Sequence, residues 1–300
     1  MEKYIKSMLI AFTIPLLLAI SCQKGDEIRK NNTDIIEFAD AVMKELCVDA
    51  FDTNGDGELS YDEAVAVTDL NMLKLTKKNF KTFDEFQYFT SVKHIPNCYF
   101  MEVGIESIKL PESIISIGGE AFHDCSNLTN VTIPEGVTSI GYCAFEDCYS
   151  LTNVTIPESV TSIGNKAFEG CHSLESVTIP EGVTSLASHI FYSCTGLESV
   201  TIHESVTSIG DGAFRNCSRL TNVTIPESVI IIGMSAFEGC KSLVSVRLNH
   251  FVPPVIHYST FGSNGLNRTF YVPAEAVETY RSANGWSKYA SSIVGYYYIK

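Results

Sequence analysis

The chain has 300 residues, of which 45% are hydrophobic and 19% charged, a composition typical of a folded globular protein and not of a disordered one. Its formal net charge of -14 at pH 7 argues against nucleic acid or an anionic membrane surface as a partner, because both need a basic surface that neutralises phosphate. Charged partners are therefore expected to be basic or metallic.

The first residues have the pattern of an export signal. Lys3 and Lys6 precede an uncharged run, Met8 to Ile20, that is too short to span a bilayer, so residues 1–21 are predicted to be a signal peptide. Ser21-Cys22 resembles the lipobox of bacterial lipoproteins, with Ala19 where leucine is usual. The resemblance implies lipidation at Cys22, with ordinary cleavage or an uncleaved anchor as alternatives, and a lipidated tether over residues 22–33.

The segment that follows the lipobox carries a second resemblance. Residues 23–27, Gln-Lys-Gly-Asp-Glu, resemble the signal that sends Bacteroidetes lipoproteins to the outer surface. This implies an outer-membrane, cell-surface lipoprotein that contacts the membrane only through its lipid anchor.

Residues 52–63 match the calcium-loop pattern D-x-[DN]-x-[DN]-G-x5-E at every specified position. The pattern resembles an EF-hand, in which Gly57 permits the turn and oxygen atoms bind Ca2+. The implied ligands are the side chains of Asp52, Asn54, Asp56 and Glu63, the carbonyl of Glu58 and a water-bridged contact from Ser60. The alternative is a turn rich in Asp, Asn and Gly that binds no metal.

Flanking helices complete this predicted module, which covers residues 34–81. Ile35, Phe38, Val42 and Leu46 recur at helical spacing before the loop, and residues 64–70 can begin a helix after it. No second loop follows, so we expect a structural calcium site in a small helical module that caps the next domain.

A repeat of 23 residues dominates the rest of the chain. Repeats cover residues 105–265, and a degenerate repeat at 82–104 is predicted to be an N-terminal cap. Each unit opens with L-x-x-V-x-I-P, a short strand ended by proline. Stacked units predict an α+β repeat protein, a solenoid with a parallel sheet on one face. Its expected core spine is one phenylalanine per repeat: Phe122, Phe145, Phe168, Phe191, Phe214 and Phe237.

The full motif, L-x-x-V-x-I-P-x-x-V-x-x-I-G-x-x-A-F-x-x-C, resembles the BspA-like leucine-rich repeats, also called the Treponema pallidum type. The resemblance implies a leucine-rich-repeat solenoid on a cell-surface protein, associated in several members with adhesion to host proteins or to other bacteria. Residues 266–300 look like the C-terminal cap of these repeats. Most of the aromatic residues that gather around this segment are expected to seal the last coil, with a binding patch as the alternative: Tyr258, Phe261, Phe270, Tyr271, Tyr280, Trp286, Tyr289 and 296–298.

Six of the ten cysteines recur once per repeat and are expected to be small buried hydrophobic residues, with disulfides or metal binding as the alternatives. They are Cys125, Cys148, Cys171, Cys194, Cys217 and Cys240. Cys47, Cys98 and Cys143 have no role that the pattern assigns.

A glutamate also recurs once per repeat, at Glu112, Glu135, Glu158, Glu181, Glu204 and Glu227. Catalysis by paired carboxylates needs two different environments, whereas these six are equivalent, so they are interpreted as an exposed acidic stripe. No other catalytic motif is present, and we expect no enzyme activity.

The candidate binding face is the outward column of strand threonines, Thr132, Thr155, Thr178, Thr201 and Thr224. The face lacks Trp, Tyr and Arg, the usual hot-spot residues, so weak or avidity-driven contacts are expected. The leading hypothesis is adhesion to host or bacterial surface proteins. The alternatives are a glycan-binding accessory of a nutrient-uptake system and a purely structural role in the envelope.

Overall fold

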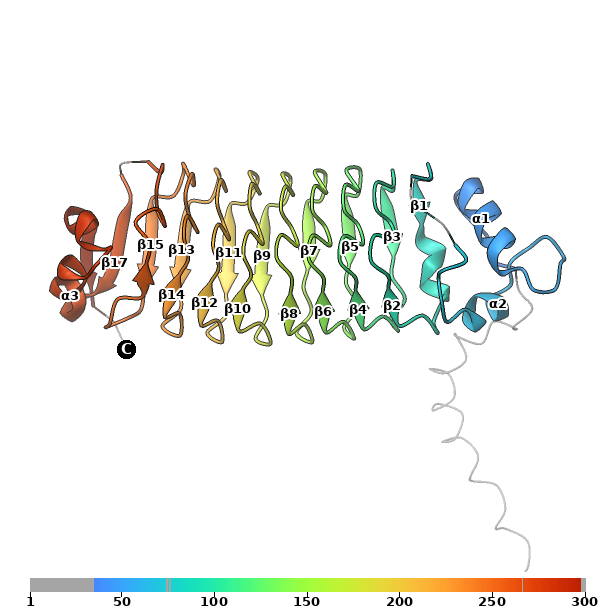
Figure 1. The fold of residues 1–300 in the computed structure, drawn as a ribbon, viewed down its shortest axis with the longest axis horizontal. Helices are drawn as coiled ribbons and strands as arrows, with labels where there is room; N and C mark the ends of the chain where they lie inside the picture. Colours follow the sequence, from blue (N-terminus) through green and yellow to red (C-terminus); the bar gives the residue numbers. More distant parts are fainter. Residues whose placement is uncertain (1–34, 74, 76, 266, 298–300) are drawn as a thin grey trace, which may run out of the picture.

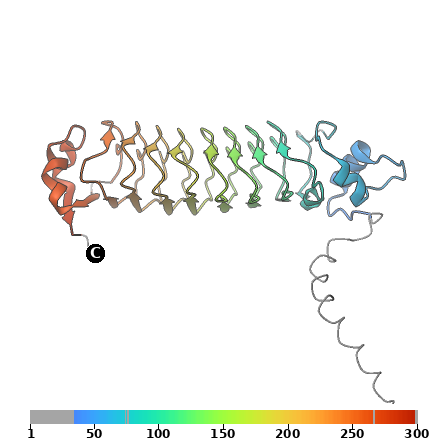
Figure 2. The ribbon, with the colours of Figure 1, turned by 90° about the horizontal axis from the view of Figure 1, so that it is seen from below.

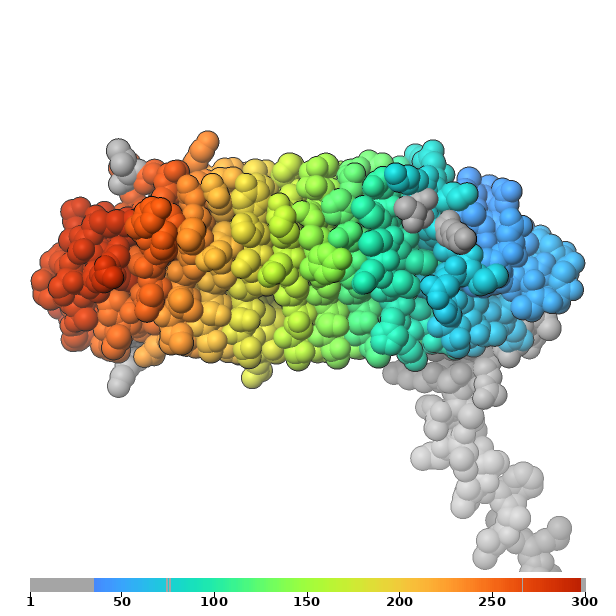
Figure 3. Space-filling model, in the orientation of Figure 1, coloured from blue at the N-terminus to red at the C-terminus, as the bar shows by residue number. Residues whose placement is uncertain are grey.

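A computed structural model describes residues 35–73, 75, 77–265 and 267–297. The protein is an elongated rod, with the helical N-terminal segment at one end and the C-terminal cap at the other (Figures 1 and 3). The coils stack in a single row between them, as the view turned by 90° also shows (Figure 2). The predicted signal peptide, Cys22 and the tether lie outside the described residues.

One ladder of parallel strands contains the L-x-x-V-x-I-P segments. Side chains alternate along each strand, so Val131 is buried while Asn130 and Thr132 are exposed. The hydrogen-bonded groups are β1-β3-β5-β7, β9-β11 and β13-β15-β17-β18. The strands are β1 (Thr82–Phe83), β3 (Ser107–Lys109), β5 (Asn130–Thr132), β7 (Asn153–Thr155), β9 (Ser176–Ile179), β11 (Ser199–Ile202), β13 (Asn222–Ile225), β15 (Ser245–Leu248), β17 (Thr269–Pro273) and β18 (Ile293–Tyr296).

Parallel strands also run along another side of the rod and form a second ladder that the repeat pattern did not predict (Figure 1). Its hydrogen-bonded groups are β2-β4-β6-β8 and β10-β12-β14-β16. Each coil adds a two-residue strand in which the second residue, such as Ile140, faces the core. Two residues are too few for an alternation of buried and exposed side chains to be recognised within one repeat. The strand forms only because its backbone pairs with the equivalent segment of a neighbouring coil. The strands are β2 (His94–Ile95), β4 (Ser116–Ile117), β6 (Ser139–Ile140), β8 (Ser162–Ile163), β10 (Ser185–Leu186), β12 (Ser208–Ile209), β14 (Ile231–Ile232) and β16 (Val255–Ile256).

The predicted phenylalanine spine is confirmed and is longer than expected. Rings stack from Phe100 through the six predicted residues to Phe261, with neighbouring centroids 4.9 to 5.6 Å apart and planes within 17°. Such separations are favourable for offset aromatic pairs. The spine belongs to one continuous core that runs from Ile36 to Ile293, so the two ends of the rod are built on the same core as the coils.

The N-terminal segment packs on the first coil through α1 (Ala41–Phe51), α2 (Tyr61–Ala66) and the 3-10 helix η1 (Asp84–Tyr88). The helix predicted before the loop is present as α1, but its buried residues are Met43, Cys47 and Phe51, and Val42 is exposed. Asp40 caps the helix by accepting hydrogen bonds from the N–H groups of residues 42 and 43, so the earlier apolar residues precede the helix and do not share its periodicity. The ring of Phe51 contacts that of Phe89 at 5.7 Å.

The C-terminal end is closed by η2 (Ala274–Ala276), α3 (Val277–Ser282) and η3 (Ser287–Ser292), and the chain then returns to the first ladder as β18. Trp286 and Tyr280 are fully buried, and the indole N–H of Trp286 donates to the carbonyl of Pro254 at 2.8 Å. Phe261 and Phe270 are buried beside them, whereas Tyr258, Tyr271 and Tyr297 are exposed. The aromatic cluster therefore seals the last coil only in part.

Candidate functional site

The predicted threonine column lies on the outer surface of the first ladder. Thr132 pairs in register with Thr155, and Thr178 pairs with Thr201. All five members, Thr224 included, are exposed. Because strands in a ladder lie about 5 Å apart, the column presents one hydroxyl and one methyl group at that interval along the rod.

The hydroxyls of this column differ from those of other threonines in the repeat. Thr129, Thr152 and Thr161 each donate their hydroxyl to a carbonyl of the preceding coil, at 3.2 to 3.3 Å. In the described chain, no protein group hydrogen bonds to the hydroxyls of Thr132, Thr155, Thr178, Thr201 or Thr224. These five are therefore free to bond a ligand, while the others hold the coils together.

The column continues beyond the threonines in both directions. Lys109 precedes Thr132 in register, and Arg247 and then Tyr271 follow Thr224. The expectation that this face lacks arginine and tyrosine is therefore wrong at its C-terminal end. The repeat pattern did not point to these residues because β15 and β17 depart from the repeat consensus. Arg247 nevertheless lies one period of 23 residues after Thr224, which was a usable signal, whereas Tyr271 follows Arg247 by 24 residues.

Arg247 is held in place by an aromatic ring. Its guanidinium lies 4.2 Å from the centre of the Tyr296 ring, a cation–π contact, and the Tyr296 hydroxyl donates to Asn249 Oδ1 at 2.8 Å. In the described residues no carboxylate forms an ion pair with Arg247. Tyr271, in the neighbouring strand, is 37% exposed. Arg and Tyr are the residue types most often found at interface hot spots.

The six repeated glutamates are all exposed, as an acidic surface stripe requires. Further carboxylates border the threonine column at Glu175 and Glu198, and Glu198 forms an ion pair with Arg219. The face thus combines free hydroxyls and scattered carboxylates with one cationic, aromatic end.

The loop at residues 52–63 lies at the N-terminal tip of the rod, between α1 and α2. Asp52 accepts hydrogen bonds from the N–H groups of Gly55 at 2.7 Å and Gly57 at 2.9 Å. Gly57 has a φ of 82°, a left-handed conformation that glycine adopts at little cost. Asn54 and Asp56 each accept from the N–H two residues later. These bonds fold the loop tightly around its own side-chain oxygens.

Glu63 joins the two ends of this loop. One carboxylate oxygen accepts from the N–H and hydroxyl of Thr53 at 2.8 and 2.9 Å, and the other accepts from the N–H and hydroxyl of Ser60 at 2.9 and 2.8 Å. Ser60 in turn caps α2, which forms a capping box. The carboxylate is buried, which acts to raise its pKa, but the bonds from Ser60 and Thr53 outweigh this and hold the pKa of Glu63 at about 2.

The donor set of the loop suits calcium by its chemistry, since every candidate ligand is oxygen. Its arrangement is less favourable: across the described residues, no three His, Cys, Asp or Glu side chains are grouped so that they could hold a metal ion. Glu63 is committed to Thr53 and Ser60 in this conformation.

The six repeated cysteines are fully buried free thiols, as expected. Each thiol donates to the carbonyl of the phenylalanine in the preceding coil, as Cys171 does to Phe145 at 3.2 Å. In the last coil Asn264 makes the equivalent bond to Phe237 at 2.8 Å. Burial raises the pKa of Cys125 and Cys240 to about 12, so both stay protonated near neutral pH. The column is therefore structural.

Three other cysteines had no assigned role. Cys47 is buried on the inner face of α1, which makes it part of the core. Cys98 and Cys143 lie in left-handed turns, with φ of 57° and 51°. Cys98 is half-buried and donates to Glu120 at 3.4 Å.

Comparison with known proteins fits this architecture. The family model of the BspA type leucine rich repeat region matches residues 93–221 and 139–267, together more than half of the chain, with six copies. The chain belongs to the BspA type leucine-rich repeat family. No curated protein matches it.

Several solved structures are similar to this BspA type protein. A leucine rich cell surface protein from Faecalibacterium prausnitzii A2-165 is 38% identical, with a TM-score of 0.52, over 54% of this chain and 44% of its own. A leucine-rich repeat protein from Bacteroides ovatus is 26% identical, with a TM-score of 0.39, over 60% and 59%. The T. pallidum leucine rich repeat protein is 24% identical, with a TM-score of 0.38, over 66% and 86%. The chain thus spans about half the length of the first two.

The described part of the chain has no helix with the length and hydropathy that a membrane crossing requires.

Proposed function

We propose that this BspA type protein is a non-catalytic surface lipoprotein that binds other surface proteins through the first ladder. The observation that carries the proposal is the column of free threonine hydroxyls that ends at Arg247 and Tyr271. The hydroxyls offer repeated weak contacts, and the arginine and tyrosine offer one strong anchor. The export pattern and Cys22 supply the anchor to the cell surface, and the Faecalibacterium protein is itself named a cell surface protein.

A rigid rod suits this role. The continuous core and the stacked phenylalanines hold the threonines at regular intervals. A partner that contacts several coils gains affinity from many contacts, and little conformational entropy is lost because the face is already ordered.

The test is a binding screen with the mature chain, residues 22–300, against an array of host matrix proteins, bacterial surface proteins and glycans at millimolar calcium. The variant Thr178→Lys places a long cationic side chain on the column and should reduce capture at least tenfold. Ser185→Lys makes the same charge change in the same coil on the second ladder, where Ser185 is also exposed, and should leave capture unchanged. Failure of the unaltered chain to bind any protein contradicts the proposal.

A glycan-binding role in a surface nutrient-uptake system is the second candidate, favoured by the exposed Tyr271 ring two strands from the free hydroxyl of Thr224. Saturable binding of oligosaccharides on the same array, without protein binding, would support it over adhesion.

We further propose that the loop at residues 52–63 binds one calcium ion with a structural role. Asp52, Asn54, Asp56 and Glu63 would supply side-chain oxygens, Glu58 its carbonyl, and Ser60 a water-bridged contact. The ion would neutralise loop carboxylates at the tip of a strongly acidic chain. Glu63 must leave Thr53 and Ser60 to take part, so calcium and the capping box compete for this one side chain.

A further inference from the structure

The second ladder changes character near its C-terminal end. In one coil the outward positions are polar: Thr207 in the turn before β12 and Ser208 in β12. One coil later the equivalent residues are Ile230 and Ile231, and Val255 in β16 follows Ile231 in register. These three aliphatic side chains are 69%, 46% and 64% exposed. A contiguous exposed apolar surface on a soluble domain usually marks an interaction site.

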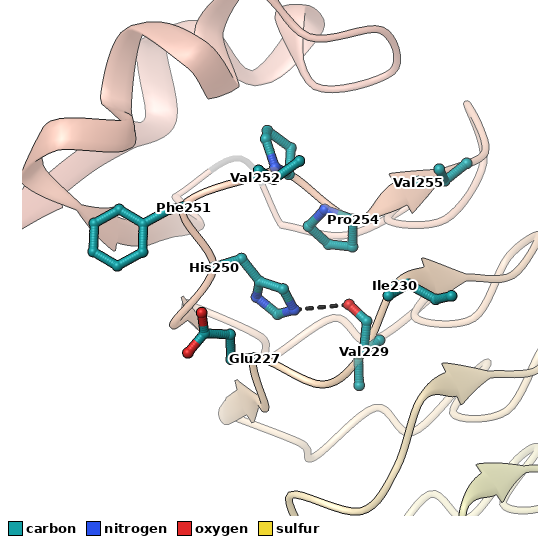
Figure 4. Close-up of a pocket in the computed structure, with 9 residues that line it drawn as sticks. Glu227, Val229, Ile230, His250, Phe251, Val252, Pro254 and Val255 are labelled. Carbon is teal, nitrogen blue, oxygen red and sulfur yellow. Dashed lines mark hydrogen bonds between the residues drawn. The ribbon is translucent and has the colours of Figure 1, made fainter.

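A pocket of about 360 Å³ opens at this place, between the loop after β15 and the turn before β14 (Figure 4). Its walls are mainly apolar, and two of its lining residues are prolines, which have no N–H to donate. The lining residues are Glu227, Val229, Ile230, His250, Phe251, Val252, Pro253, Pro254 and Val255.

His250 brings an unpartnered acceptor to the pocket. The imidazole is only 4% exposed, and its Nε2 lies 2.7 Å from the carbonyl of Val229. A carbonyl can only accept, so Nε2 carries the proton, and Nδ1 of the neutral ring is an acceptor. Nδ1 is buried and has no hydrogen-bond partner in the described chain. Burial lowers the pKa of His250, which favours the neutral ring.

The remaining polar side chain of the lining is Glu227, also an acceptor. In Figure 4 the imidazole lies between the Val229 carbonyl and the Glu227 side chain. The backbone N–H groups of Val229, Ile230 and Val255 already donate to carbonyls. The two polar side chains of the pocket thus accept hydrogen bonds, and one of them carries a negative charge. The other lining side chains form an apolar surface around these two.

We propose that this pocket binds a lysine side chain presented by a partner protein. The aliphatic stem of lysine would pack on Ile230, Val252 and Val255, and its ammonium group would donate to Glu227 and to Nδ1 of His250. A lysine combines a long apolar stem with three donors and no acceptor, which complements this lining. The net negative charge of the chain also attracts basic partners. This inference rests on the proposed role in protein binding.

The test uses a capped peptide with one lysine between two valines, titrated by calorimetry against the mature chain. The same peptide with acetyl-lysine, which removes the charge, should bind at least tenfold more weakly. Glu227→Gln should cause a similar loss. Ile230→Thr introduces the residue that Thr207 has at the equivalent position one coil earlier. This variant should also weaken binding without unfolding the coil. Butylamine tests whether a small free amine is the ligand of the pocket, and it should bind more weakly than the peptide.

Glu158→Gln is the matched control, because Glu158 occupies the equivalent position in a coil that lacks the pocket. It should leave peptide affinity unchanged. Equal binding of the acetylated peptide, equal binding by the Glu227→Gln variant, or butylamine binding as tightly as the peptide would overturn the proposal. If the unaltered chain captures proteins on the array and Glu227→Gln captures them equally well, the pocket fails while the proposed function stands. If the array shows no protein capture, the proposed function fails.

Discussion

The guanidinium of Arg247 in β15 is stacked on the ring of Tyr296 in β18, although β17 lies between these two strands. The contact depends on the C-terminal cap, which returns β18 to the ladder and lets the Tyr296 side chain reach back to Asn249. The cap therefore does more than seal the last coil, because it also orients the cation at the end of the threonine column.

This relationship gives the first prediction. Arg247→Ala should weaken partner capture at least tenfold, because it removes the unpaired cation of the face, and Tyr296→Ala should weaken it less, by freeing the arginine to move. Tyr296→Phe keeps the ring and should retain capture. Surface plasmon resonance with a partner found on the array measures these changes. Lys241→Ala, an equal change of charge at an exposed turn, should have no effect.

Calcium should raise the melting temperature of the mature chain, and a chelator should reverse the rise, because binding to the folded loop stabilises it. Glu63→Gln should abolish the difference between the two conditions. Glu58→Gln is the control, since the proposed ligand there is the carbonyl and its side chain pairs with Lys44. Differential scanning calorimetry measures the difference, and equilibrium dialysis counts the bound ion. An identical melting curve in calcium and chelator, with no ion retained, would contradict the calcium site.

Acid should destabilise the chelator-treated protein through Glu63. Its folded pKa of about 2 lies below its usual value of 4.5, so the stability that its carboxylate contributes is complete above about pH 4.5 and is lost as the pH falls towards 2. Glu63→Gln removes this titration. Urea unfolding should show the variant less stable by about 2 kcal/mol at pH 7, a typical value for hydrogen bonds to a charged group. A gap that stays constant down to pH 3 would contradict this assignment.

The cysteine column should be inert in the folded protein. Burial raises the pKa values of its thiols, and each thiol already donates to a carbonyl. Among the described cysteines, Cys98 is the most accessible and should react first with iodoacetamide at pH 8. Mass spectrometry should find Cys171 modified only after unfolding in denaturant. Fast labelling of Cys171 in the native protein would show that the column opens.

Phe168 should be a major determinant of stability. Its ring stacks on Phe145 at 5.4 Å and on Phe191 at 5.6 Å, and it is fully buried. Phe168→Ala should lower the free energy of unfolding by about 3 to 5 kcal/mol, the usual cost of such a cavity. Phe168→Leu, which fills most of the space, should cost less. Equilibrium unfolding followed by circular dichroism measures both variants, and equal stability of the two would be inconsistent with a tightly stacked spine.

Much of the fold could be predicted because the covalent spacing repeats. A residue such as Cys171 recurs after 23 positions, and stacking of equal coils must place its equivalents in one buried column. The same logic placed Thr178 on an outward column. It could not place the inner face of α1, because that helix is preceded by an extended segment whose apolar residues do not continue the helical period.

The sequence by itself determined the repeat, the buried columns, the threonine column and the composition of the loop at residues 52–63, because each depends only on local alternation and a constant period. The tertiary structure alone decided what lies beside those columns where the period fails. Val255 follows Ile231 in register although the two are separated by one residue more than the repeat period. Tyr296 contacts Arg247 only because the cap returns the chain to the first ladder. Likewise His250 and Glu227 come together in the pocket by stacking of adjacent coils. Such contacts join residues whose spacing follows no rule along the chain, so only the packed coils reveal them.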